Sequence, residues 1–75
     1  MINVKEITQT CMACPSQWDG YTEDGKKIYV RYRWGQLSIY LDGNPIFLEI
    51  RGNGLDGEMS YTELKNTTSD IVKWP

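Results

Sequence analysis

The sequence predicts a single small domain (1–75) that is mainly β or α+β: a twisted antiparallel meander of four or five strands with one short C-terminal helix. Apolar and polar residues alternate along most of the chain, which is the period of a β-strand. Turn residues separate these alternating segments at short intervals. A chain of 75 residues forms only a thin core. A sheet of this size can curl toward a small barrel of the SH3 or OB kind.

The clearest strands lie in the middle of the chain, at 26–34, 36–41 and 46–51. Gly35 and the turn residues 42–45 separate them, so we expect consecutive strands to pair as antiparallel neighbours. Alternation places one set of mostly apolar residues on the inward face, namely Ile28, Val30, Tyr32, Trp34, Leu37, Ile39, Leu41, Ile46, Leu48 and Ile50.

Weaker signals flank this meander. Strands are predicted at 1–8, with Ile2, Val4 and Ile7 on one side, and at 17–22, with Trp18 as a buried anchor. A loop at 10–15 carries both cysteines, and Asp24-Gly25 favours a turn. Near the C-terminus, Ser60 and Glu63 have the spacing of a capping box and predict a helix. That helix should be brief because 66–69 is poor helix material, and 70–74 is either a closing strand or a packed tail.

The outward face of the meander carries aromatic rings between cationic side chains. We call this set the Tyr/Arg face; it comprises Lys27, Tyr29, Arg31, Arg33, Tyr40, Phe47 and Arg51. Rings and cations together are typical of single-stranded nucleic-acid platforms and of hot spots between proteins. Arg also suits bidentate contact with a carboxylate or a phosphate. Three interpretations stay open: an ordinary solvated or covered surface, a protein interface, and a nucleic-acid or nucleotide site.

The composition argues against an enzyme. The chain has no His, which removes the usual proton carrier near neutral pH and the commonest metal ligand. Gly52, Gly54 and Gly57 lack the Lys and Ser/Thr of a phosphate loop. The carboxylates are not at calcium-loop spacing; they are Asp19, Glu23, Asp24, Asp56 and Glu58. We therefore expect no catalytic residues and no cofactor.

Cys11 and Cys14 form a C-x-x-C pair, which is half of a zinc site. One chain cannot complete that site, so a metal would require a dimer in which each chain supplies two cysteines. A redox pair needs a helix start in an α/β context, whereas Pro15 and predicted strands surround this pair. Two reduced thiols in a loop are the simplest interpretation, and a local disulfide is a further alternative.

Charge and segment composition bear on location and partners. The net charge of −2 gives no bulk attraction to nucleic acid. No signal peptide is visible and no apolar run approaches the ~20 residues of a membrane span, so we expect a cytoplasmic protein without membrane contact. The edges of so small a sheet leave two states open, a monomer or a strand-edge homodimer.

The span 14–35 is similar to short uncharacterised proteins of bacteria and their phages. The residues that carry this resemblance are Cys14-Pro15-Ser16-Gln17-Trp18-Asp19-Gly20 and Tyr29-Val30-Arg31-Tyr32-Arg33-Trp34-Gly35. The resemblance implies a stand-alone domain encoded by a phage or mobile element. It also implies action by binding a host protein, defence components included.

Taken together, the sequence favours a non-catalytic binding module that acts through protein–protein contacts. One alternative is a phage-type, anti-CRISPR-like inhibitor of a host defence or nucleoprotein complex, in which the acidic loops meet a basic surface. The other alternative is nucleic-acid or nucleotide binding through the Tyr/Arg face.

Overall fold

The computed structural model describes residues 1–12, 16–50 and 59–75. They form six strands and one helix, which confirms the prediction of a mainly β fold with a short C-terminal helix. In chain order the elements are β1 (Ile2–Cys11), β2 (Ser16–Thr22), β3 (Lys27–Arg33), β4 (Gln36–Leu41), β5 (Asn44–Ile50), α1 (Tyr61–Thr67) and β6 (Val72–Lys73).

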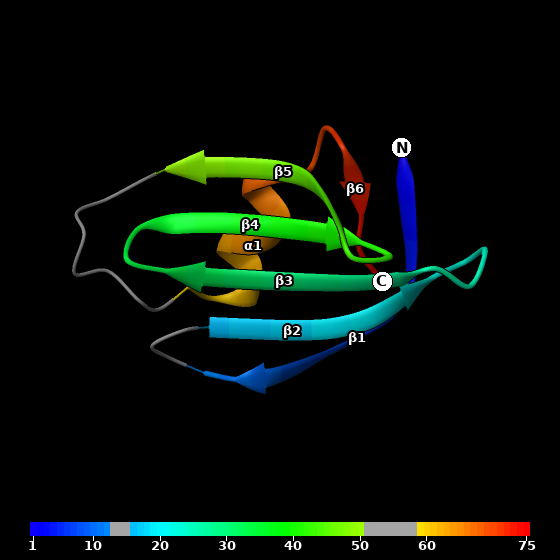
Figure 1. The fold of residues 1–75 in the computed structure, drawn as a ribbon, viewed down its shortest axis with the longest axis horizontal. Coiled ribbons are helices and arrows are strands. Elements are labelled where there is room, and N and C mark those ends of the chain that lie inside the picture. Colours follow the sequence, from blue (N-terminus) through cyan, green and yellow to red (C-terminus); the bar gives the residue numbers. More distant parts are fainter. Residues whose placement is uncertain (13–15, 51–58) are drawn as a thin grey trace.

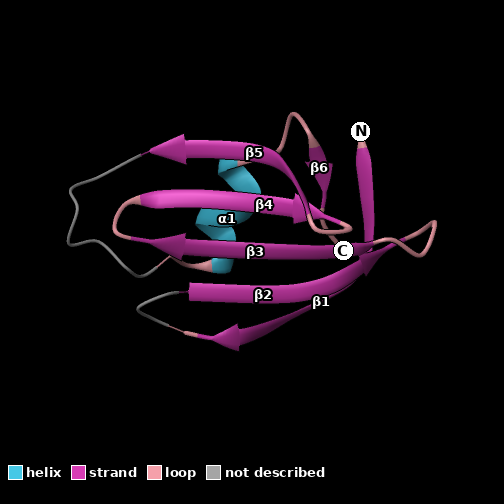
Figure 2. Ribbon diagram, viewed as in Figure 1, coloured by secondary structure: helices cyan, strands magenta, loops and turns pink. Residues whose placement is uncertain are grey.

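All six strands belong to one curled, half-barrel sheet in the order β5-β4-β3-β2-β1-β6 (Figure 1). Strands β1 to β5 pair as antiparallel neighbours, whereas β6 adds to β1 in parallel. The sheet is open, because β5 and β6 end it on opposite sides. The helix α1 lies behind the sheet in Figure 2. We call the face that α1 covers the inner face and the opposite face the outer face.

The core fills the inner face. Trp18 is 2% exposed, and the alternating residues of β3 and β4 around it are as deeply buried, as predicted. The C-terminal segment closes this core from the other side, since Met59, Leu64 and Val72 are also buried. Among the described residues, the buried apolar side chains are Val4, Trp18, Ile28, Val30, Tyr32, Leu37, Ile39, Met59, Leu64 and Val72.

Strand β1 runs to Cys11 and so occupies part of the predicted loop. Its pairing with β2 is irregular between Val4 and Glu6. That bulge inserts one residue, which shifts the alternation and turns Ile7 toward the same core as Ile2 and Val4. The predicted grouping of these three apolar residues is therefore confirmed, although strict alternation does not produce it.

Strand β5 presents the face opposite to the predicted one. Ile46, Leu48 and Ile50 are 38%, 63% and 76% exposed, and Phe47 packs against the core. The β4–β5 pairing shifts between Ile39 and Tyr40, and this bulge changes the phase of the strand. The predicted inward position of the three aliphatic residues is wrong for that reason.

Both hairpins of the meander close with two residues in the left-handed region. Trp34 and Gly35 have φ values of 53° and 73°, and Asp42 and Gly43 have 50° and 81°. Two such residues form the loop that matches the twist of paired strands. Trp34 is consequently at a hairpin tip with 64% of its surface exposed, so its predicted inward position is wrong.

The predicted N-cap of the helix is confirmed. The hydroxyl of Ser60 accepts a hydrogen bond of 3.1 Å from the backbone N–H of Glu63 and also contacts the Glu63 carboxylate at 3.3 Å. After α1, the Thr68 hydroxyl donates to the Leu64 carbonyl and accepts from the Trp74 indole at 2.8 Å. The segment 70–74 therefore combines both expected forms, a two-residue strand and a packed tail.

A buried serine joins the sheet to the helix segment. Ser16, at the start of β2, donates to the Met12 carbonyl at 2.6 Å and accepts from the Met59 backbone N–H at 3.0 Å. It is fully buried. One hydroxyl thus ties the end of β1, the start of β2 and the entry to α1 together.

Gly20 permits the close approach of β1 to β2. It is buried and pairs with Ile7, and a Cβ atom built on it would lie 1.9 Å from the Glu6 carbonyl oxygen. A Cβ atom does not come within 3.0 Å of a heavy atom to which it is not bonded, and the obstacle here is backbone rather than a flexible side chain. Only a residue without a side chain fits here.

We expect Gly20→Ala to lower the free energy of unfolding by about 3 kcal/mol, the upper end of the usual cost of overpacking, because the β1–β2 pairing must open to admit the methyl group. Gly25→Ala is the matched control: its Cβ meets open space, although its φ of +85° makes the substitution strained. That strain alone costs about 1–2 kcal/mol. Urea unfolding followed by Trp fluorescence compares the two variants, and an equal loss in both contradicts this role of Gly20.

Candidate binding face

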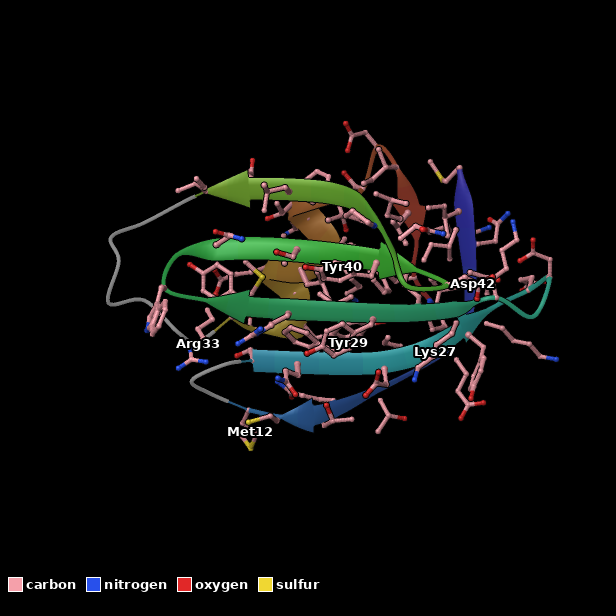
Figure 3. All side chains as sticks on the ribbon, viewed as in Figure 1. Met12, Lys27, Tyr29, Arg33, Tyr40 and Asp42 are labelled. Carbon is pink, nitrogen blue, oxygen red and sulfur yellow. The ribbon has the colours of Figure 1, made fainter. Side chains whose placement is uncertain are left out.

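The strand register places most residues of the Tyr/Arg face next to one another on the outer side of the sheet. Tyr29 on β3 lies opposite Tyr40 on β4, Arg31 lies opposite Ser38, and Arg33 lies opposite Gln36. Because side chains alternate across a strand, all of these point away from α1. Figure 3 shows Tyr29 and Tyr40 beside each other on adjacent strands, with Lys27 and Arg33 toward opposite ends of β3.

One expected member of this face is not found there. Phe47 pairs with the core residue Ile39 and packs inward, so its assignment to the Tyr/Arg face is wrong; the bulge in β5 is the physical reason. Arg51 lies outside the described residues. Glu49 lies opposite the buried Leu37, so its side chain is on the inner-face side of β5 and not among the cations of the outer face.

An open hollow of about 450 Å³ lies over the centre of the face. The rings of Tyr29 and Tyr40 form its apolar part, with centroids 5.9 Å apart and planes tilted by 33°. Two cations and one carboxylate are among the lining residues, so the local charge balance is positive although the chain is negative overall. The residues that line it are Asp19, Lys27, Tyr29, Arg31, Tyr40 and Gly43.

A second hollow of about 250 Å³ adjoins the first along β3 and β4. Arg31 and Tyr40 line both hollows, which places these two side chains between them. None of the described residues that line the second hollow is a carboxylate, and Arg31 and Arg33 make it cationic. Its lining residues are Arg31, Arg33, Trp34, Gln36, Ser38 and Tyr40.

Arg31 has unused hydrogen-bonding capacity. Within the described part of the chain, its Nε is the one buried side-chain nitrogen or oxygen that has no hydrogen-bond partner. Guanidinium groups pair with carboxylates and phosphates through two parallel N–H donors. Because the Nε is buried, an anionic group beside Arg31 would pair with the terminal nitrogens of the guanidinium.

Trp34 is a surface residue of this site that the sequence interpretation missed. Its ring lies 4.2 Å from the Arg33 guanidinium carbon, a cation–π contact at the rim of the second hollow. A bulky residue in the left-handed region is strained, and burial in the core does not compensate for that strain here. The available signal was the Trp34-Gly35 pair between two alternating segments, which marks a two-residue hairpin loop.

One of the acidic loops that the anti-CRISPR-like alternative uses for docking forms local bonds within its own turn. In the β2–β3 turn, Asp24 accepts a short hydrogen bond from Thr22 and lies 3.7 Å from the Lys26 ammonium. The Thr22 bond, with a smaller effect from Lys26, holds the pKa of Asp24 below its usual value. Asp19 lies in the hollow instead of in a loop, and Asp56 and Glu58 lie outside the described residues.

Two further observations concern metal ligands and membrane spans. No group of three or more His, Cys, Asp or Glu within 1–12, 16–50 and 59–75 is arranged to hold an ion. Cys11 ends β1 and is half-buried, and Cys14 lies outside this part of the chain. No helix of the described ranges has both the length and the apolar character that crossing a bilayer requires.

Comparison with known proteins adds no relative. No family model matches the chain, and neither does any curated protein or solved structure.

We expect Trp34→Asn to raise the free energy of unfolding by about 0.5–1 kcal/mol. Asn accepts the left-handed conformation that strains Trp by roughly 1–2 kcal/mol, and the lost cation–π contact offsets ~0.5–1 kcal/mol of the gain. Asp42→Asn at the equivalent turn position is the control and should stay within about 0.5 kcal/mol of the wild type. Thermal and urea unfolding measure both changes; a destabilised Trp34→Asn protein would show that Trp34 supports the fold.

Proposed function

We propose that this chain is a non-catalytic binding module that docks another protein on the Tyr/Arg face. The observation that carries the proposal is the pair of adjoining hollows centred on Arg31 and Tyr40. Both are open depressions on a sheet surface. Such a surface suits inserted side chains of a partner, whereas small-molecule sites are concave and bury most of their ligand.

The residue types at the hollows are those that dominate protein–protein binding energy. Tyr, Trp and Arg are enriched among hot-spot residues, which cluster near the centre of an interface. Here Tyr29, Tyr40 and Trp34 offer rings that are already at the surface, and strand pairing fixes the backbone that carries them. A rigid aromatic surface loses little conformational freedom on binding.

The positive charge of the two hollows indicates the kind of partner that they suit. Arg31, Arg33 and Lys27 make the two hollows cationic, with Asp19 as the counter-charge at one end. We infer that the partner presents an acidic segment with at least one apolar side chain, so that a carboxylate meets Arg31 and the apolar group packs on the Tyr29 and Tyr40 rings. The resemblance to short phage and bacterial proteins favours a host protein in the cytoplasm as that partner.

We expect the double variant Arg31→Ala/Tyr40→Ala to lose its partner in a tagged pull-down from host lysate, because these two side chains line both hollows. Lys73→Ala on β6 is the matched control: it removes an exposed cation away from the face and should retain the partner. Circular dichroism verifies that each variant is folded. A partner retained by the double variant, or lost equally by the control, contradicts the proposal.

Nucleic-acid binding is the second candidate, and the cationic second hollow next to exposed rings favours it. Base stacking on Tyr40 or Trp34 would be accompanied by phosphate contacts from Arg31 and Arg33, and such contacts release counterions. This function predicts that a fluorescent single-stranded oligonucleotide binds at low salt and is released as salt increases. It also predicts that Arg31→Ala/Arg33→Ala weakens the binding. Absence of binding at low salt excludes it and leaves the protein partner.

A further inference from the structure

We propose that a second copy of this chain pairs with the outer edge of β5, through an antiparallel β5–β5 contact centred on Leu48. The inference is independent of the proposed function, because it uses a different part of the molecule. β5 is a terminal strand of the sheet, and no described segment pairs with its outer edge.

The exposed side chains along β5 are mostly apolar, and few features protect its outer edge from pairing with another strand. Leu48 and Ile50 are 63% and 76% exposed, and Ile46 is 38% exposed. Natural edge strands avoid pairing by means of charged side chains, prolines, bulges or short length. β5 has seven residues, and its Pro45 and its bulge lie near its start. The stretch from Phe47 to Ile50 contains one charge, Glu49.

The other end of the sheet is protected in several ways, which makes β5 the preferred edge. β6 has only two residues and covers β1 only at Ile2 and Asn3. The rest of that edge, from Lys5 to Thr10, is mostly polar and includes two charged residues. Two sheets that meet there would bury charge and hydroxyl groups, whereas two β5 strands would bury aliphatic groups.

The sequence of β5 is self-complementary about Leu48. Antiparallel pairing centred on that residue sets Leu48 against Leu48 of the second copy and Ile46 against Ile50 of the second copy. The intervening pair is Phe47 with Glu49, so the two Glu49 carboxylates do not face each other. The order Ile-Phe-Leu-Glu-Ile at 46–50 thus places aliphatic against aliphatic at every outer-face position. This palindromic spacing favours a second copy over an unrelated strand.

The twofold axis of such a contact runs perpendicular to the sheet, since antiparallel strands continue one sheet into the next. Both outer faces would then lie on the same side of the dimer. The two Tyr/Arg faces would flank a shared aliphatic stripe of Ile46, Leu48 and Ile50. One partner with two acidic segments could engage both at once.

Sedimentation of the wild-type chain over a wide range of concentration tests the contact. We expect a concentration-dependent dimer of twice the 8.7 kDa chain mass. Leu48→Lys should abolish it by facing two ammonium groups across the axis. Tyr21→Lys, which adds the same charge at an exposed ring of β2, should keep it. A wild-type chain that stays monomeric overturns the proposal, as does a dimer that survives Leu48→Lys or is lost equally in Tyr21→Lys.

Disulfide trapping tests the register. In a Cys11→Ser/Cys14→Ser background, Leu48→Cys should cross-link with itself under mild oxidation, because directly opposed Cα atoms lie ~4.5–5.5 Å apart, within disulfide reach. Ile50→Cys should not, because four residues of offset separate its two copies by about 13 Å. Efficient cross-linking of Ile50→Cys with none for Leu48→Cys overturns the register. Equal cross-linking of both overturns the specific contact.

Discussion

The close approach of β1 to β2 at Gly20 is the constraint on which the rest of the fold depends. The Glu6 carbonyl occupies the space that any side chain at position 20 would need. With the two bulges of β1, this approach lets the sheet curl instead of lying flat. The curl carries the start of β1 to the short β6, and the inner face so formed receives α1. Ser16 then fixes the entry to α1 through a buried hydrogen bond.

The two faces of the sheet have different roles: the inner face forms the core, and the outer face presents side chains to solvent. A chain this short has only one thin core, and α1 with its flanking residues packs on the inner face to complete it. The outer face is left uncovered by any described element, so its rings and guanidinium groups meet solvent. Strained Trp34 at the hairpin tip and the unsatisfied Nε of Arg31 are features that stability alone does not explain. Local departures of this kind concentrate at functional sites.

Much of the fold follows from local pattern, and the wrong prediction for β5 has a single cause. Alternation over 26–41 predicts the burial of Ile28, Val30, Leu37 and Ile39, and the Ser60 cap predicts where α1 begins. Bulges cannot be read from alternation, because an inserted residue leaves no mark in a single sequence. The bulge in β5 therefore turned Phe47 inward and Leu48 outward, against expectation.

The candidate site, like the fold, was predictable where its residues lie in regular strands. Tyr29, Arg31, Arg33 and Tyr40 lie in regular parts of β3 and β4, where period two and short hairpins determine both face and register. Trp34 was misplaced because the same period was extended one residue too far, into the turn. Its exposure depends on which two residues form the loop, and that choice is set by the pairing of Arg33 with Gln36.

The claim that the outer face is the binding surface is tested most directly by NMR of the isotope-labelled chain titrated with its purified partner. The account predicts that the largest shifts fall on the Arg31 side-chain Nε–H and on the backbone amides of Tyr29, Trp34 and Tyr40, while α1 stays unchanged. Shifts confined to α1 and β6, with the Arg31 signal unmoved, would contradict it.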